Sequence, residues 1–145
     1  QEGVVDALMT SDIVHLAGHG FEAKEAPGLA GVRLADGWFG ATDVPERIKA
    51  RLVVLAACRT GRESGPASMA WGGLPHALLA AGAEHVVWTA DDVEDEITAD
   101  LMRRFHTLHK HLDPARSLSR ALDSVRRDRG HVGGLLPFRV SGIPA

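Results

Sequence analysis

The chain has little of several features that mark specialised classes of protein. Its single cysteine, Cys58, makes a disulfide within the chain impossible, so a reducing, cytoplasmic location is expected. No apolar run approaches the ~20 residues of a membrane-spanning helix, and we therefore expect no membrane partner. The net charge of −3 argues against a general nucleic-acid binder. These absences leave a small soluble enzyme or a binding domain.

The size and composition are those of one globular domain. The 145 residues are 45% hydrophobic and 24% charged, an ordinary balance for a soluble protein. A chain of this length buries roughly 68–70% of the surface that it exposes when unfolded, so it needs no metal or disulfide to fold. Residues 1–10 have the pattern of an amphipathic helix that ends directly before a strand. Because a domain rarely opens in this way, we expect residues 1–145 to be an excerpt of a longer chain.

Short apolar runs bounded by Gly, Asp or Arg predict four β-strands. They cover residues 13–17, 52–57, 85–89 and 138–141. The middle two runs are continuous and aliphatic, which is typical of strands buried on both faces of a parallel sheet. Helical patterns separate the strands, over residues 69–81, 94–111 and 114–129, and a short helix is expected near residues 43–49. This alternation predicts an α/β fold with a largely parallel sheet.

The two longest helical patterns carry specific signals. One has a single apolar stripe at steps of four, four and three residues, made of Ile97, Leu101, Phe105 and Leu108. The other begins with Asp113-Pro114, an N-cap followed by proline at the first helical position. Residues 91–100 carry only acidic charges, and residues 101–131 are mainly basic. We interpret both charged runs as solvated helix faces.

Two reactive side chains follow the first two long strands. His19 comes just after the first strand, between two glycines, and Cys58 comes directly after the second. Ligand sites of open parallel sheets lie at the carboxyl ends of the strands, and neighbouring strands are about 4.8 Å apart. If these strands are neighbours, the imidazole and the thiol face one gap, which is the minimum for thiol catalysis. Each residue alone is more often an inert buried cysteine or a turn histidine, and it is their pairing at one sheet edge that favours catalysis.

The segments around these two residues resemble the CHAT family of caspase-like cysteine peptidases. They read Asp12-Ile-Val-His-Leu-Ala-Gly-His19-Gly20 and, about forty residues later, Leu52-Val-Val-Leu-Ala-Ala-Cys58-Arg-Thr-Gly61. The family is related to caspases, gingipains and separase, and the resemblance runs from about residue 8 to residue 143. It implies a caspase-like three-layer sandwich, with helices on both faces of the sheet. It also implies further strands before residue 12, which these residues lack.

The resemblance assigns roles to individual residues. His19 matches the catalytic histidine and Cys58 the nucleophile, while the N–H groups of Gly20 and Cys58 match the oxyanion hole. This assignment agrees with general physical principles, because donors aimed at a developing oxyanion are typically worth ~2.7–4 kcal/mol each. The implied activity is that of a cysteine endopeptidase, a hydrolase that cleaves a protein substrate. We expect a regulated bacterial effector with a regulatory or repeat module elsewhere in the full chain.

The expected specificity differs from that of caspases. Caspases carry Gln two positions before the nucleophile, and here that position is Ala56, so cleavage after Asp is not expected. Relatives that cleave after Arg or Lys use an acidic residue in the loop after the next strand. Asp91 and Asp92 occupy that loop, and Asp92 is the better candidate for holding a basic side chain before the cut. The alternative is that both simply begin the acidic front of the following helix.

Several other functions fit the sequence less well. A metal site is disfavoured, because only His106 and His109 of the 106/109/111 cluster share a helix face, and His15 and His19 are about 13 Å apart along a strand. The chain has no G-x-S-x-G motif for a serine hydrolase and no nucleotide-binding glycine motif. We expect no metal and no cofactor. The main alternative is a catalytically silent caspase-like module that binds protein.

Overall fold

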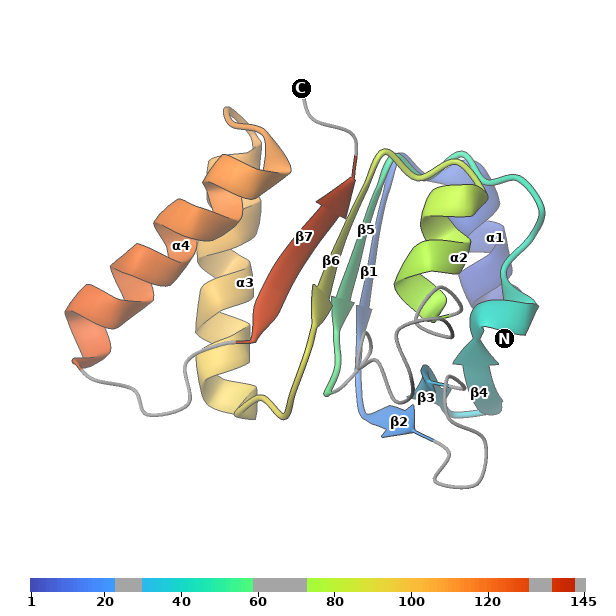
Figure 1. The fold of residues 1–145 in the computed structure, drawn as a ribbon, viewed down its shortest axis with the longest axis horizontal. Helices are drawn as coiled ribbons and strands as arrows, with labels where there is room; N and C mark the ends of the chain where they lie inside the picture. The colour runs from blue at the N-terminus through green and yellow to red at the C-terminus, as the bar shows by residue number, and fades with distance from the viewer. Residues whose placement is uncertain (23–29, 59–72, 131–136, 143–145) are drawn as a thin grey trace, which may run out of the picture.

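The computed structural model describes residues 1–22, 30–58, 73–130 and 137–142. Its main sheet has four strands in the order β1 (Ile13–Ala17), β5 (Leu52–Ala56), β6 (His85–Thr89) and β7 (Phe138–Gly142). The first three strands are parallel, and β7 runs antiparallel beside β6 (Figure 1). The sheet is therefore largely parallel, as the sequence predicted. Within the described part of the chain, β1 pairs only with β5.

Helices cover both faces of this sheet. They are α1 (Glu2–Thr10) and α2 (Leu74–Ala80) on one face, and α3 (Asp95–His109) and α4 (Pro114–Arg129) on the other (Figure 1). The predicted caspase-like three-layer sandwich is confirmed. None of the helices in the described ranges is long and apolar enough to cross a membrane.

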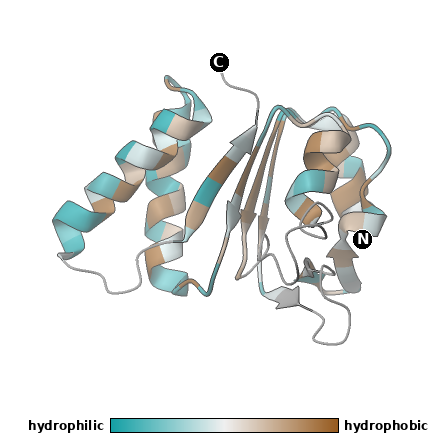
Figure 2. Cartoon of the chain, in the orientation of Figure 1, coloured by the Kyte–Doolittle hydropathy of each residue, from teal (hydrophilic) through white to brown (hydrophobic). Residues whose placement is uncertain are grey.

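Two hydrophobic cores fill the space between the layers. Every residue of β5 is buried, and alternate side chains point to opposite faces. Val54 packs on the α3 side with the predicted helical stripe, in which Leu101 and Phe105 are fully buried. Val53 packs on the opposite side with Leu8 of α1 and residues of α2. Figure 2 shows the hydrophobic residues concentrated in the strands and on the helix sides turned toward them.

A second, smaller sheet was not predicted. It consists of β2 (Gly20–Glu22), β3 (Ala30–Leu34) and β4 (Gly37–Gly40), all antiparallel. Two residues, Ala35-Asp36, join β3 to β4, and Gly37 follows with a φ of 147° that glycine adopts most easily. The Asp-Gly pair after an apolar strand is a strong hairpin signal that could have revealed this sheet. The sheet matters for the site, because β2 begins directly after His19.

Some predicted helix boundaries were wrong. The expected helix over 43–49 is absent, and the only helical turn nearby within the described residues is the 3₁₀ helix η1 (Ala41–Asp43). Pro45 explains the error, since proline disfavours the helical conformation of the residue before it. For the helix predicted over 69–81, the described part begins at Leu74 and ends before Gly82, whose φ is 118°. Residues 69–72 lie outside the described residues.

Candidate active site

His19 and Cys58 follow neighbouring strands at the same edge of the main sheet. The register of β1 and β5 pairs Ala17 with Ala56, and each candidate residue comes two positions after its member of that pair. The N–H of Gly18 continues the ladder by donating to the carbonyl of Ala56 at 3.4 Å. The predicted adjacency of the two strands is thus present in the structure, and both residues lie beyond the carboxyl ends of parallel strands.

Gly20 lies against the backbone of Cys58. A Cβ atom placed on Gly20 would overlap the carbonyl oxygen of Cys58, and it would lie only 2.7 Å from the carbonyl carbon and 3.2 Å from the nitrogen of that residue. Any other amino acid would push the two backbones apart, so this is a position where the chain requires glycine. The carbonyl of His19 also accepts a hydrogen bond of 2.8 Å from the N–H of Arg33 on β3. The His19–Gly20 segment is therefore held between the small sheet and Cys58.

The thiol of Cys58 contacts the segment that joins β6 to α3. It is a free, half-buried cysteine whose Sγ lies 3.5 Å from the N–H of Val93 and 3.8 Å from the carbonyl oxygen of Val93. The hydroxyl of Thr89, a fully buried residue at the end of β6, donates to the carbonyl of Ala57. These contacts fix both the backbone before Cys58 and its sulfur. Sequence reasoning did not identify Val93, because a main-chain contact leaves no signal in side-chain chemistry.

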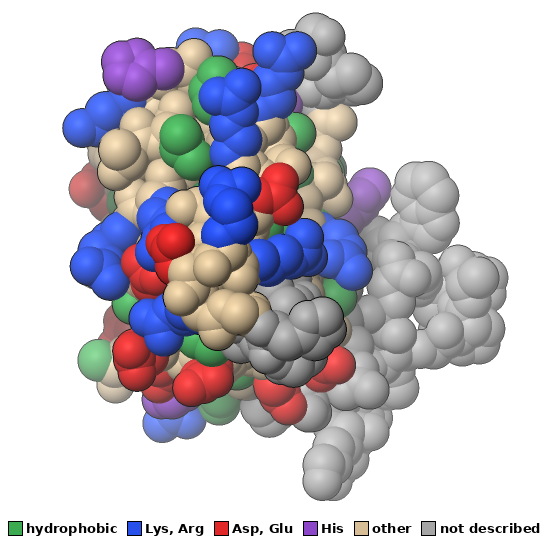
Figure 3. Space-filling model, turned by 90° about the vertical axis from the view of Figure 1, so that its left-hand side faces the viewer, with side chains coloured by type: hydrophobic (Ala, Val, Ile, Leu, Met, Phe, Trp, Pro, Cys, Tyr) green, Lys and Arg blue, Asp and Glu red, His purple; other side chains and the backbone are tan. Residues whose placement is uncertain are grey.

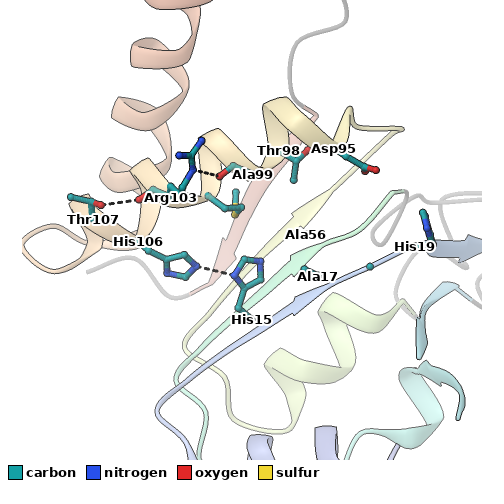
Figure 4. A pocket seen from close by; sticks show the side chains of 12 residues that line it. His15, Ala17, His19, Ala56, Asp95, Thr98, Ala99, Arg103, His106 and Thr107 are labelled. Atoms are coloured by element: carbon teal, nitrogen blue, oxygen red, sulfur yellow. Dashed lines mark hydrogen bonds between the residues drawn. The ribbon is translucent and has the colours of Figure 1, made fainter. Parts of the chain in front are cut away.

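A cavity of about 910 Å³ opens between β1 and α3, and His19 lines it. Its walls are mainly apolar and include Ala17, Ala56 and Met102, while Asp95 of α3 lines the same cavity. Figure 4 shows His19 toward one end of the cavity and His15 with His106 toward the other. Cys58 is not among the residues that line it. The imidazole of His19 is thus exposed to a volume large enough for several side chains of a bound peptide.

Asp91 and Asp92 lie on the segment between β6 and α3, next to the Val93 that contacts the sulfur. Both are exposed, and the N–H of Asp92 donates to Oδ1 of Asp91 at 2.9 Å. They lie at the same edge as Cys58, but neither lines the cavity beside His19. The carboxylate that does line it, Asp95, is the first residue of α3. The sequence placed Asp95 in an acidic helix front and gave no reason to single it out.

The arrangement supplies the parts of acyl-transfer chemistry. It brings a free thiol, an imidazole and the backbone of a glycine to one edge of a rigid sheet. In the ranges that the structure describes, no group of three or more His, Cys, Asp or Glu side chains is placed to hold one metal ion.

Comparison with known protein families places both candidate residues within one family model. The family model described as the CHAT domain matches residues 2–132, which is most of the chain and includes both β1 and β5 with the residues that follow them. No curated protein matches the chain.

Proposed function

This chain belongs to the CHAT domain family, and from that premise we propose that it is a cysteine endopeptidase that acts through a Cys58–His19 dyad. The observation that carries the proposal is the contact between Gly20 and the backbone of Cys58. The backbone of Cys58 fills the space that a side chain at position 20 would need, which is why glycine follows His19. This contact supports a single site formed by the segments of His19 and Cys58.

The proposed reaction proceeds in two steps. His19 takes the proton of the Cys58 thiol, and the sulfur attacks the carbonyl carbon of a peptide bond, while the N–H groups of Gly20 and Cys58 stabilise the oxyanion. His19 gives a proton to the leaving amine as the C–N bond breaks, which leaves a thioester on Cys58. His19 then takes a proton from water, and the resulting hydroxide attacks the thioester. As the C–S bond breaks, this proton passes from His19 to the sulfur, which restores the free thiol. Each oxyanion donor contributes on the order of 2.7–4 kcal/mol to the transition state.

We propose a basic residue before the scissile bond. Asp91 and Asp92 are exposed carboxylates within two positions of Val93, whose N–H lies against the sulfur of Cys58. A guanidinium can form paired, charge-assisted hydrogen bonds with a carboxylate in such a position. Asp92 remains the preferred candidate. This choice rests on the family resemblance and on the position of the segment.

The setting in which the peptidase acts is also a proposal. By analogy with related domains, we propose a regulated bacterial effector whose regulatory or repeat module lies elsewhere in the full chain, and whose substrate is a protein. The single cysteine supports a cytoplasmic location.

A cleavage assay tests the proposed activity. The protein is incubated with a proteome-derived peptide library, both as the isolated domain and as the full-length chain. New N-termini are identified by mass spectrometry. We expect cleavage by the native protein and none by Cys58→Ala or His19→Ala, with both variants folded by circular dichroism. His111→Ala, at an exposed position after α3, is the matched control and should cleave normally. Cleavage that persists in folded Cys58→Ala would show that Cys58 is not the nucleophile. No cleavage by the native protein, with equal binding of uncleaved peptides by all variants, would favour the silent binding module.

A further inference from the structure

Two histidines outside the proposed dyad face each other across the cavity. His15 belongs to β1 and His106 to α3, and 91 positions separate them in the sequence. The Nδ1 atom of His15 and the Nε2 atom of His106 form a hydrogen bond of 3.0 Å, and the ring centroids are 5.0 Å apart (Figure 4). Both side chains line the same cavity as His19. Neither has a role in the proposed peptidase reaction.

The separation of these two nitrogens also matches a pair of ligands on one metal ion, provided that the donor ring shifts the shared proton to its other nitrogen. Imidazole nitrogens bind zinc at about 2.0–2.1 Å, so two of them on one ion lie about 2.9 Å apart at a right angle and about 3.4 Å apart at a tetrahedral angle. The observed 3.0 Å is near the right-angle value. Right angles between nitrogen ligands are typical of Cu²⁺ and Ni²⁺ sites. The cavity leaves room for water to complete the coordination.

A third histidine, His109, follows His106 on α3. His109 is not a third ligand, because its Nδ1 contacts the carbonyl of Leu112 at 3.0 Å and its ring stacks on Phe105.

We propose that His15 and His106 form a binding site for a divalent transition-metal ion, with Cu²⁺ preferred over Zn²⁺. Among the described residues no carboxylate is grouped with these two nitrogens, so the site is unsuited to Mg²⁺ and Ca²⁺, which require oxygen ligands. The metal ion would connect β1 to α3. Since β1 pairs only with β5 in the described part of the chain, this connection would hold in place the strand that leads to His19. The site does not depend on the proposed peptidase activity.

Metal binding is tested on the tag-free Cys58→Ser protein, in which no thiol can bind or reduce copper. Cu²⁺ is titrated under electron paramagnetic resonance, and Zn²⁺, Ni²⁺ and Mg²⁺ under calorimetry. We expect one Cu²⁺ per chain with hyperfine coupling to two imidazole nitrogens, weaker binding of Zn²⁺ and none of Mg²⁺. His15→Gln and His106→Gln should each weaken Cu²⁺ binding at least tenfold. His111→Gln and His19→Gln serve as controls and should leave it unchanged.

A second measurement needs no substitution at the site. In the ¹⁵N-labelled Cys58→Ser protein, Zn²⁺ should shift the imidazole ¹⁵N signals of His15 and His106 together and leave that of His19 in place. Binding of metal should also raise the melting temperature, because it favours the folded chain. Loss of Cu²⁺ binding in His19→Gln but not in His15→Gln would place the metal at the dyad and overturn the proposal. If the signals of His15 and His106 did not change at saturating Zn²⁺, the contact would be only a hydrogen bond between two histidines, and the proposal would be wrong.

Discussion

At the scale of single residues, Gly20 makes the most direct link between packing and function. Replacing it with alanine would force the added methyl group into the carbonyl of Cys58. We expect Gly20→Ala to lower the free energy of unfolding by roughly 1–3 kcal/mol, as overpacking does. If the N–H of Gly20 is the oxyanion donor that we propose, its displacement should also lower kcat by about 10²–10³-fold. Urea denaturation and steady-state kinetics measure the two effects separately.

Gly142 offers a matched control for this substitution. A Cβ atom there would overlap the carbonyl oxygen of Glu84, at the opposite end of the sheet from Cys58. Gly142→Ala should therefore cost stability without a comparable loss of kcat in the fraction that remains folded. If the two variants lost activity equally, the effect of Gly20→Ala would be one of stability alone, and its role in the oxyanion hole would be wrong.

The carboxylates at positions 91 and 92 give a second residue-scale prediction. If Asp92 holds a basic side chain, Asp92→Ala should lower kcat/KM for substrates with Arg or Lys before the cut by at least tenfold. Substrates with Leu at that position should be unaffected, and Asp91→Ala should have the smaller effect. Profiling all three enzymes on one peptide library makes the comparison. An unchanged preference in Asp92→Ala, or a preference for Leu or Met in the native enzyme, would leave both carboxylates as surface charge.

At the scale of secondary-structure elements, an ionic network joins α3 to α4. Asp100 of α3 contacts Arg104 at 3.0 Å and Arg129 of α4 at 3.5 Å, and its side chain is only 14% exposed. Arg104 in turn contacts Asp128 of α4 at 2.6 Å. Figure 3 shows acidic and basic side chains interspersed on this side of the molecule. The two charged runs in the sequence therefore serve helix packing as well as solvation.

This network makes stability depend on pH in a defined direction. The hydrogen bond from Arg104, with added attraction from Arg129 and Arg103, lowers the pKa of Asp100 below its usual 3.8. The unfolded chain then binds more protons in acid, so this contribution is present at pH 7 and is lost as the pH falls below about 3.8 through the lowered value.

The prediction is tested with Asp100→Asn. Its urea midpoint should lie below that of the native protein at pH 7, and the difference should shrink as the pH approaches 3. Asp123→Asn is the control, because that side chain is 55% exposed and its contact with Arg126 is 3.5 Å long. It should change the midpoint little at any pH. A constant difference for Asp100→Asn down to pH 3 would mean that packing, and not ionisation, accounts for its effect.

Most of the helices and strands could be predicted from the sequence. The strand at residues 13–17 and the helix at residues 114–129 were predicted with their observed bounds. Asp and Gly bound the apolar run of the strand, and the Asp113-Pro114 cap marks the start of the helix. Asp113 caps that helix as expected, by accepting a hydrogen bond of 2.9 Å from the N–H of Arg116. The small sheet escaped prediction because its strands are short and rich in glycine. Such strands give little alternation, and only the Asp-Gly turn marks them.

At the scale of the whole molecule, strand order decides what meets at the site. The placement of His19 and Cys58 at one sheet edge follows from parallel topology, and the sequence could predict it once the strands were recognised. The contact of Val93 with the sulfur and the approach of His15 to His106 could not be predicted in this way. Both depend on how α3 and the segment before it pack on the sheet, and that packing is set by side-chain shape over the entire core.

The central claim is that His19 activates the thiol of Cys58, and the rate of thiol alkylation tests it most directly. Because Cys58 is the only cysteine, iodoacetamide incorporation measured by mass spectrometry reports on this thiol alone. A thiol paired with a histidine reacts well below pH 8, whereas an inert one reacts slowly there. We predict that at pH 6.5 the native protein reacts at least tenfold faster than folded His19→Ala and than the urea-unfolded chain. Equal rates for the native protein and His19→Ala would contradict the account.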